Sequence, residues 1–179
     1  MGTDMTTIIW MRYYNFSSDL EVQSMHKFTN SVGDSTILVY ATSTTDCTNG
    51  GGKSGILFRI RKSSGDYYNG VGVKIQIGDT SCFKIHQHAI AYDSQSLRLY
   101  ILATNAYGTS PTTKTTVLFT IDPTKAGSAM IEAAQKIVNG ENWVWRHYSA
   151  ILSINKSFLP VAGFSQKESE CFLHIAGVS

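Results

Sequence analysis

The feature that most constrains the fold is a strand–turn–strand–loop–strand pattern that recurs about every 60 residues. Its clearest copy runs from His88 to Ile121, where the turn residues Asp93-Ser94 separate two apolar-alternating runs and a polar loop precedes a third. Alternation with a period of two residues beside turn residues is typical of half-buried strands. The related central segments are YILATN (100–105), LVYATS (38–43) and PVAGFS (160–165).

The flanking segments correspond as well. They are HKFTNSVGD (26–34), HAIAYDSQS (88–96) and YSAILSINK (148–156) before the central strands, and ILFRI (56–60), VLFTI (117–121) and CFLHI (171–175) after them. VGVKIQI at 71–77 adds a fourth strand. We therefore predict an all-β fold of three tandem units of about 60 residues and about four strands each. One repeat domain spans 1–179, with units at approximately 15–77, 78–140 and 141–179.

Two segments complicate this scheme. Residues 128–140 carry a serine cap, alanines and an Asn-Gly stop, which favour a short helix, whereas their position in the repeat predicts a strand. The third unit stops after CFLHIAG without a fourth strand, and TTIIWMRYY at 6–14 is an additional strand. We expect 6–14 to complete a blade, in its own chain or in a neighbouring one, because pairing satisfies an exposed strand edge.

The segment HAIAYDSQSLRLYILATN followed by TTVLFTID resembles a β-propeller blade of the kelch-like or secreted-repeat type. Asp93, Ala103 and Asp122 stand where such blades carry an aspartate, a small residue and a second aspartate. The double glycine of kelch, the Trp-Asp dipeptide and the aspartate box are absent, so the resemblance implies a fold and no activity. A β-trefoil is the alternative, because it uses three units while a propeller ring needs four to eight.

Net charge and the length of apolar runs limit the classes of partner that the chain can have. The formal charge is +2 with both signs interspersed, which argues against nucleic-acid binding. No apolar run reaches the roughly 20 residues of a membrane-spanning helix, so we expect no membrane insertion. MGTDMTTIIWMRYY lacks the features of a signal peptide, and although the compartment is unknown, an extracellular or cell-surface location is favoured.

The cysteines and histidines offer little chemistry. Cys47, Cys82 and Cys171 form no CxxC pair, and three buried reduced thiols are favoured over one disulfide and a free thiol. His86 and His88 alternate on an expected strand, but no third ligand lies near them, and His26 matches His88 by repeat position. A repeated structural role is therefore favoured over a metal site.

The glycine-rich stretch CTNGGGKSG at 47–55 resembles a phosphate-binding loop only superficially. It lacks the first glycine of that motif and the helix that should follow it, so a hairpin loop is expected. No nucleophile elbow, HExxH motif or EF-hand is present, and we expect neither an enzyme nor a cofactor.

Aromatic side chains and sequons suggest a second class of function. Trp143, Trp145, Tyr67 and Tyr68 are candidates for stacking on sugar rings, whereas Trp10 is expected to fill the packing between blades. Asn15 and Asn155 begin N-glycosylation sequons.

The leading prediction is a non-enzymatic structural or interaction protein that forms a homo-oligomer through strand complementation or blade packing, as a ring or a filament. The alternative is a carbohydrate-binding, lectin-like module with glycan partners.

Overall fold

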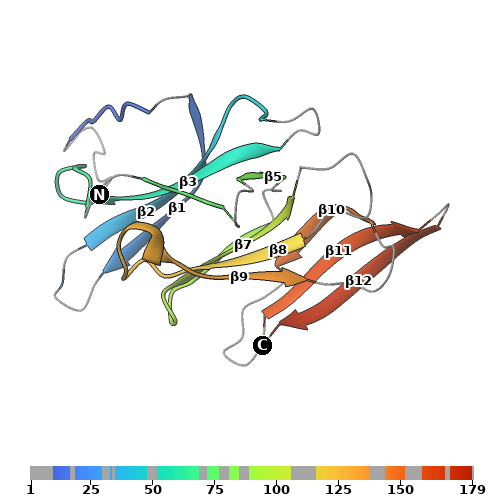
Figure 1. The fold of residues 1–179 in the computed structure, drawn as a ribbon. Helices are drawn as coiled ribbons and strands as arrows, with labels where there is room; N and C mark the ends of the chain where they lie inside the picture. Colours follow the sequence, from blue (N-terminus) through green and yellow to red (C-terminus); the bar gives the residue numbers. More distant parts are fainter. Residues whose placement is uncertain are drawn as a thin grey trace, which may run out of the picture.

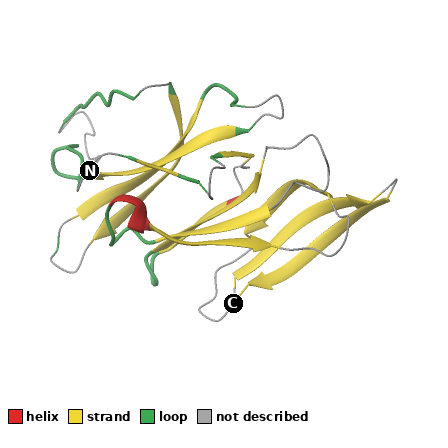
Figure 2. Cartoon of the chain, in the orientation of Figure 1, coloured by secondary structure: helices red, strands yellow, loops and turns green. Residues whose placement is uncertain are grey.

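The protein is all-β, as expected. The computed structural model describes residues 10–16, 19–29, 33, 35–47, 52–68, 72–76, 81–84, 89–105, 116–137, 144–151, 159–167 and 170–178. Besides its strands, the described part contains the 3₁₀ turn η3 (Gly127–Met130) (Figures 1 and 2). The strands are β1 (Leu20–Thr29), β2 (Ser35–Ser43), β3 (Lys53–Arg61), β4 (Val73–Lys74), β5 (Cys82–Lys84), β6 (Ile90–Asp93), β7 (Arg98–Asn105), β8 (Thr116–Ile121), β9 (Ile131–Ile137), β10 (Val144–Ile151), β11 (Leu159–Lys167) and β12 (Glu170–Val178).

These strands form two antiparallel sheets. A nine-stranded sheet has the order β1-β2-β3-β5-β7-β8-β9, with β4 beside β3 and β6 beside β7, and a three-stranded sheet has the order β10-β11-β12. The described strands close neither a propeller ring nor a trefoil barrel, because the larger sheet ends at β1 and β9.

The short strand β5 joins the two halves of the larger sheet. It pairs with the first residues of β3 on one side and with the last residues of β7 on the other. The sheet bends there, so that β2–β3 and β7–β8 face each other around a shared apolar core. That core is built from Leu38, Tyr40, Leu57, Ile75, Phe83, Leu99, Ile101, Ala103, Val117, Phe119, Ile121 and Met130.

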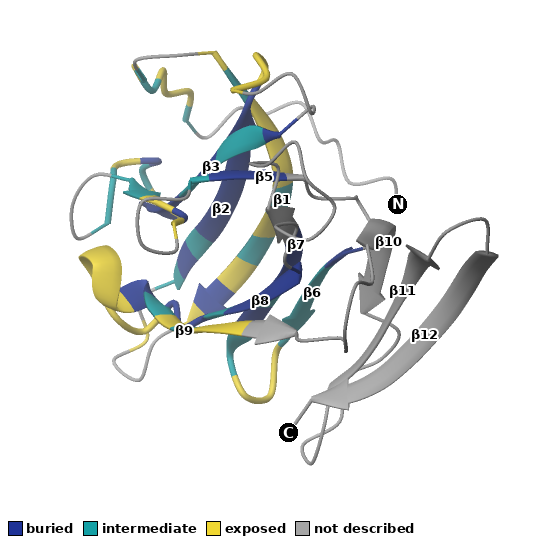
Figure 3. Ribbon diagram, turned by 45° about the vertical axis from the view of Figure 1, so that its right-hand side comes forward, coloured by how far each residue is buried: buried dark blue, intermediate teal, exposed yellow. Residues whose placement is uncertain are grey.

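The alternation of side chains explains which strands are buried on both faces. On β7 and β8, Leu99 and Phe119 point into the shared core, while Leu102 and Leu118 are buried on the opposite face. β10 lies against β6 and β7, which brings the smaller sheet next to the second half. Figure 3 shows β2 and β8 buried along almost their whole length, in contrast to the alternately exposed β1.

The conflict over residues 128–140 is resolved in favour of a strand. Only Gly127–Met130 form a 3₁₀ turn, and Ile131–Ile137 pair along β8 as β9. Pairing with β8 therefore outweighs the helix propensity of Ala133 and Ala134, which is worth only tenths of a kcal/mol per residue. Asn139 and Gly140 lie outside the described residues.

The expectation of three reduced thiols is wrong for two of them. Cys47 and Cys82 form a disulfide whose Cα atoms are 6.2 Å apart, within the usual range for this bond. The bond ties the loop after β2 to β5. The sequence alone could not show this pairing, because the two residues meet only when β5 is placed beside β3. The side chain of Cys171 is not among those described.

Lys53 and Ser54 of the stretch 47–55 begin β3, which pairs antiparallel with β2, so no helix follows them; residues 48–51 lie outside the described part. The Lys53 ammonium donates to the carbonyls of Ser43 at 3.2 Å and Thr44 at 2.7 Å. Its charge therefore serves the loop itself.

Candidate functional site

The outer face of β2–β3 is an apolar surface covered by the chain's own residues 10–16, called the N-terminal strap here. The face consists of Val39, Ala41, Phe58 and Ile60. Every second strap residue approaches it: Trp10, Tyr14 and Phe16 pack against the face. Met11 and Tyr13 in between are 63% and 90% exposed.

Polar side chains anchor the strap to the turn that follows β3. Trp10 Nε1 donates to the Lys62 carbonyl at 2.7 Å, Arg12 Nε donates to the Ser64 carbonyl at 3.1 Å, and the Tyr14 hydroxyl donates to the Gly65 carbonyl. Arg12 also forms an ion pair with Asp66 at 3.1 Å. Within the described part of the chain, residues 10–16 are in no strand. Residues 10–14 were expected to be part of a strand; residues 6–9 lie outside the described part.

An aromatic cluster forms where the strap meets the sheet. The Tyr14 ring lies 5.1 Å from Tyr67 and 5.8 Å from Phe58, and Phe16 lies 5.3 Å from Phe58, centroid to centroid. Burial raises the pKa of Tyr14 and of Tyr67 above the ordinary tyrosine value. Beside the cluster is a cavity of about 290 Å³, lined by Tyr14, Asn15, Phe16, Asp19, Leu20, Val22, Ala41 and Phe58.

Only some of the ligand-binding residues predicted from the sequence lie in the described part of the chain. Tyr67 belongs to the aromatic cluster. Two guanidinium groups approach the ring of Tyr68, with the Cζ atoms of Arg59 and Arg61 at 4.9 and 5.0 Å from its centroid. Trp143 and Asn155 lie outside the described residues, as does the side chain of Trp145, so the prediction of a sugar-stacking site there stays a prediction.

The structure also describes the surroundings of two further residues singled out in the sequence, Asn15 and His26. Asn15 lines the cavity beside the aromatic cluster, and its glycosylation stays a prediction. His26 stacks on Tyr92 of β6 with ring centroids 4.8 Å apart, and burial lowers its pKa. His86 and His88 lie outside the described residues.

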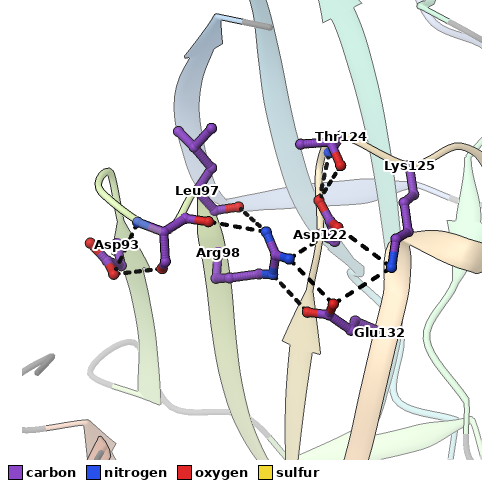
Figure 4. A network of polar contacts seen from close by, with 8 residues as sticks. Asp93, Leu97, Arg98, Asp122, Thr124, Lys125 and Glu132 are labelled. Carbon is purple, nitrogen blue, oxygen red and sulfur yellow. Dashed lines mark hydrogen bonds and ion pairs between the residues drawn. The ribbon is translucent and has the colours of Figure 1, made fainter. Parts of the chain in front are cut away.

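The second site is a network of charged side chains that joins β7, β8 and β9 around Asp122 (Figure 4). Arg98 forms ion pairs with Asp122 at 3.2 Å and with Glu132 at 2.6 Å, and Lys125 approaches both carboxylates at 3.6 and 3.5 Å. Asp122 also accepts hydrogen bonds from the backbone N–H and hydroxyl of Thr124 at 2.9 and 2.6 Å.

The charges in this network are mutually compensated. Burial alone would raise the pKa of Asp122, but the Thr124 hydrogen bonds and the charges of Arg98 and Lys125 outweigh it and lower that pKa. The hydrogen bond from Arg98 likewise lowers the pKa of Glu132. A cluster in which ion pairs and hydrogen bonds hold both carboxylates suits a structural clamp.

Asp93 has a similar local role. Its carboxylate accepts from the N–H of Gln95 at 2.9 Å and from the Ser96 hydroxyl at 2.5 Å, so it caps the β6–β7 turn. Both aspartates on which the blade resemblance relied therefore hold turns at strand ends.

The outer edge of β12 is a third surface. In the three-stranded sheet β12 pairs with β11 on one side, and no described strand pairs with its other side. Its ladder runs through nine consecutive residue pairs without a register shift.

The described residues form neither a metal-ligand cluster nor a membrane-spanning helix. No group of three or more His, Cys, Asp or Glu side chains there could hold a metal ion. No helix of this part is long and apolar enough to cross a membrane. Comparisons with protein-family models, with curated proteins and with solved structures found no match for the chain.

We predict that Gly65→Ala weakens strap packing as well as straining the turn. Gly65 has a φ of +72°, and a Cβ there would lie 2.5 Å from the Trp10 ring. The expected loss of unfolding free energy is about 3 kcal/mol, measured by urea denaturation. Gly33→Ala is the matched control, because Gly33 has a φ of +86° and open space around it; a loss of about 1 kcal/mol is expected. Equal losses in both variants would contradict strap packing at Gly65.

We predict that Asp122→Asn destabilises the protein by about 3 kcal/mol at pH 7, because Asp122 is only 3% exposed and its ion pairs are lost. The native pKa of Asp122 is lowered, so its stabilisation is present above the unfolded value of about 3.9 and disappears as the pH falls through the lower native pKa. The variant should therefore lose less stability on acidification than the unmodified chain, measured by urea denaturation at several pH values. Glu21→Gln on exposed β1 is the control, and parallel acid profiles for Asp122→Asn and the unmodified chain would refute the clamp.

Proposed function

We propose that this chain is a non-enzymatic structural protein that associates with copies of itself by β-strand addition at the outer edge of β12. The observation that carries the proposal is the regular ladder of this strand, whose other side pairs with no described strand. Free N–H and C=O groups along such an edge are a template for a further strand.

The other strands with an unpaired side in the described sheets are poorer templates. β4 and β6 have ladders of only two and four residue pairs, and the terminal strands β1, β9 and β10 are irregular. The β1 ladder shifts register between Val22 and Ser24, and the β9 ladder shifts opposite Thr120 and Ile121. The β10 ladder shifts twice, around His147. Bulges twist an edge and disrupt pairing, and they are a common protection of edge strands. β12 has no such shift and, in the sequence ECFLHIAGV, no lysine, arginine or proline.

The number of strands in each consecutive run also supports strand addition at β12. Consecutive strands pair as β1-β2-β3-β4 and as β6-β7-β8-β9, whereas β10-β11-β12 has three strands. A strand added to β12 takes the place that β4 has beside β3 and β9 has beside β8. Residues 10–14, which were expected to supply a completing strand, pack on the first unit instead. In this proposal the strand added to β12 therefore comes from a second copy.

The register indicates which β12 residues face the free edge. Pro160 has no N–H, so the pair Pro160–Gly177 cannot exchange two hydrogen bonds. In an antiparallel ladder hydrogen-bonded and non-hydrogen-bonded pairs alternate. On this basis Gly177 and Ile175 direct their N–H groups outward, and Ala176 directs its N–H toward β11.

This alternation gives a matched pair of proline variants. The unmodified chain should elute with a mass above one copy in size-exclusion chromatography with light scattering. Ile175→Pro should remove an outward donor and give a single-copy mass, while sparing the hydrogen bonds between β11 and β12. Ala176→Pro should break a ladder bond and destabilise the protein by about 3 kcal/mol. A single-copy mass for the unmodified chain at every concentration would refute strand addition, as would an oligomer that Ile175→Pro leaves intact.

Carbohydrate binding is a second candidate, and the cavity beside the strap favours it. Aromatic rings of Tyr14, Phe16 and Phe58 lie beside the polar side chains of Asn15 and Asp19. Aromatic faces with nearby carboxylate and amide groups match the apolar C–H faces and hydroxyls of a sugar.

We predict that a glycan array probed with the full chain gives signals that fall at least about tenfold in Phe16→Ala, about 1.4 kcal/mol, because a stacking ring is lost. Tyr13→Ala, at a residue 90% exposed, is the control and should bind as the unmodified chain does. No signal on the array, or an equal signal from both variants, would argue against this candidate.

A further inference from the structure

The N-terminal strap shows that the outer face of β2–β3 and the 61–66 turn form a binding site for an extended peptide. We propose that this site also accepts the strap of a second copy of the chain, so that two copies exchange straps. The inference concerns a different surface from β12 and does not rest on strand addition there.

The site recognises side chains and makes no ladder with the peptide. Within the described residues, the polar contacts of the strap with the turn start from the side chains of Trp10, Arg12 and Tyr14. Together with Phe16 these residues define the pattern Trp-x-Arg-x-Tyr-x-Phe. An extended backbone places alternate residues on one side, so all four can reach the same surface at once.

The turn is organised in advance to receive this pattern. The Gly65 N–H donates to the Arg61 carbonyl at 2.8 Å, the Arg61 N–H donates to the Asp66 carbonyl at 2.8 Å, and the Ser64 hydroxyl donates to the Asp66 carboxylate at 2.7 Å. The left-handed glycine at 65 leaves room for the indole of Trp10. Fixed carbonyls and a preformed space reduce the entropy lost when a peptide binds.

A second copy is the occupant that fits best, because its strap has the same sequence and makes the same contacts. No described backbone–backbone hydrogen bond ties residues 10–16 to the sheet, so exchange replaces side-chain contacts with identical ones. The balance between the chain's own strap and a neighbour's is then set by effective concentration, which favours the chain's own strap at low protein concentration.

A labelled peptide of residues 10–16, WMRYYNF, tests the site by fluorescence polarisation. The full chain carrying Trp10→Ala and Tyr14→Ala should bind it at least about tenfold more tightly than the unmodified chain, whose own strap competes. A peptide with Met11→Ala and Tyr13→Ala should bind equally well, because these residues are exposed in the strap. A peptide with Trp10→Ala and Tyr14→Ala should not bind.

Equal binding by all three peptides, or equal binding by both proteins, would overturn the proposed site. If the double variant does not fold, Arg12→Ala replaces it, since Arg12 is half exposed and its loss removes only polar anchors. In that variant a smaller gain in peptide affinity is expected, and no gain would count against the site.

Exchange between copies is tested in full chains that carry Ile175→Pro, which isolates the strap from any pairing at β12. Donor- and acceptor-labelled copies should show energy transfer that rises with protein concentration and is abolished by excess WMRYYNF peptide. Trp10→Ala with Tyr14→Ala should abolish it as well. Absence of energy transfer at every concentration, or transfer that the peptide leaves unchanged, would overturn strap exchange while leaving β12 pairing to its own experiment.

Discussion

The bend of the larger sheet at β5 is the constraint on which the other described features depend. A strand of three residues pairs with β3 on one side and β7 on the other, and so brings two halves of the sheet face to face. Leu57 and Phe119 lie in the same core only because of this bend. The disulfide from Cys82 to Cys47 acts at the same point, since it fixes β5 to the loop after β2.

Burying one face of β2–β3 in this core leaves the other face to be covered. Val39 and Phe58 point outward by strict alternation, and an apolar surface of this kind is costly in water. The strap covers it with aromatic rings and places the exposed Tyr13 on the far side. The same physical requirement, a covered outer face, accounts for both the alternating sequence of the strap and the glycine turn that holds it.

The sequence predicted most of the described strands because their apolar alternation is local information. Of the expected strand 71–77, however, only Val73–Lys74 form a strand in the described part, and residues 10–14 form none. The prediction failed where distant residues decide the outcome: β9 is a strand because β8 offers it a ladder, and Cys47 meets Cys82 only through β5. The strap could have been anticipated in part, because Trp10, Tyr14 and Phe16 alternate like a half-buried strand. The sequence could not show that the strap makes no described ladder with the sheet. Its side chains bind instead to backbone carbonyls, Trp10 to that of Lys62 and Arg12 to that of Ser64. Likewise, nothing in the sequence pairs Arg98 with Glu132.

The uneven regularity of the described sheet edges limits how many copies the proposed β12 contact could join. If β12 pairs with the β12 of another copy, each chain contributes the same edge, and the contact is closed by a two-fold axis. Such a contact stops at two chains however high the concentration. Longer assemblies then require a second surface of different geometry, and the shifted ladders of β1, β9 and β10 are ill suited to provide it.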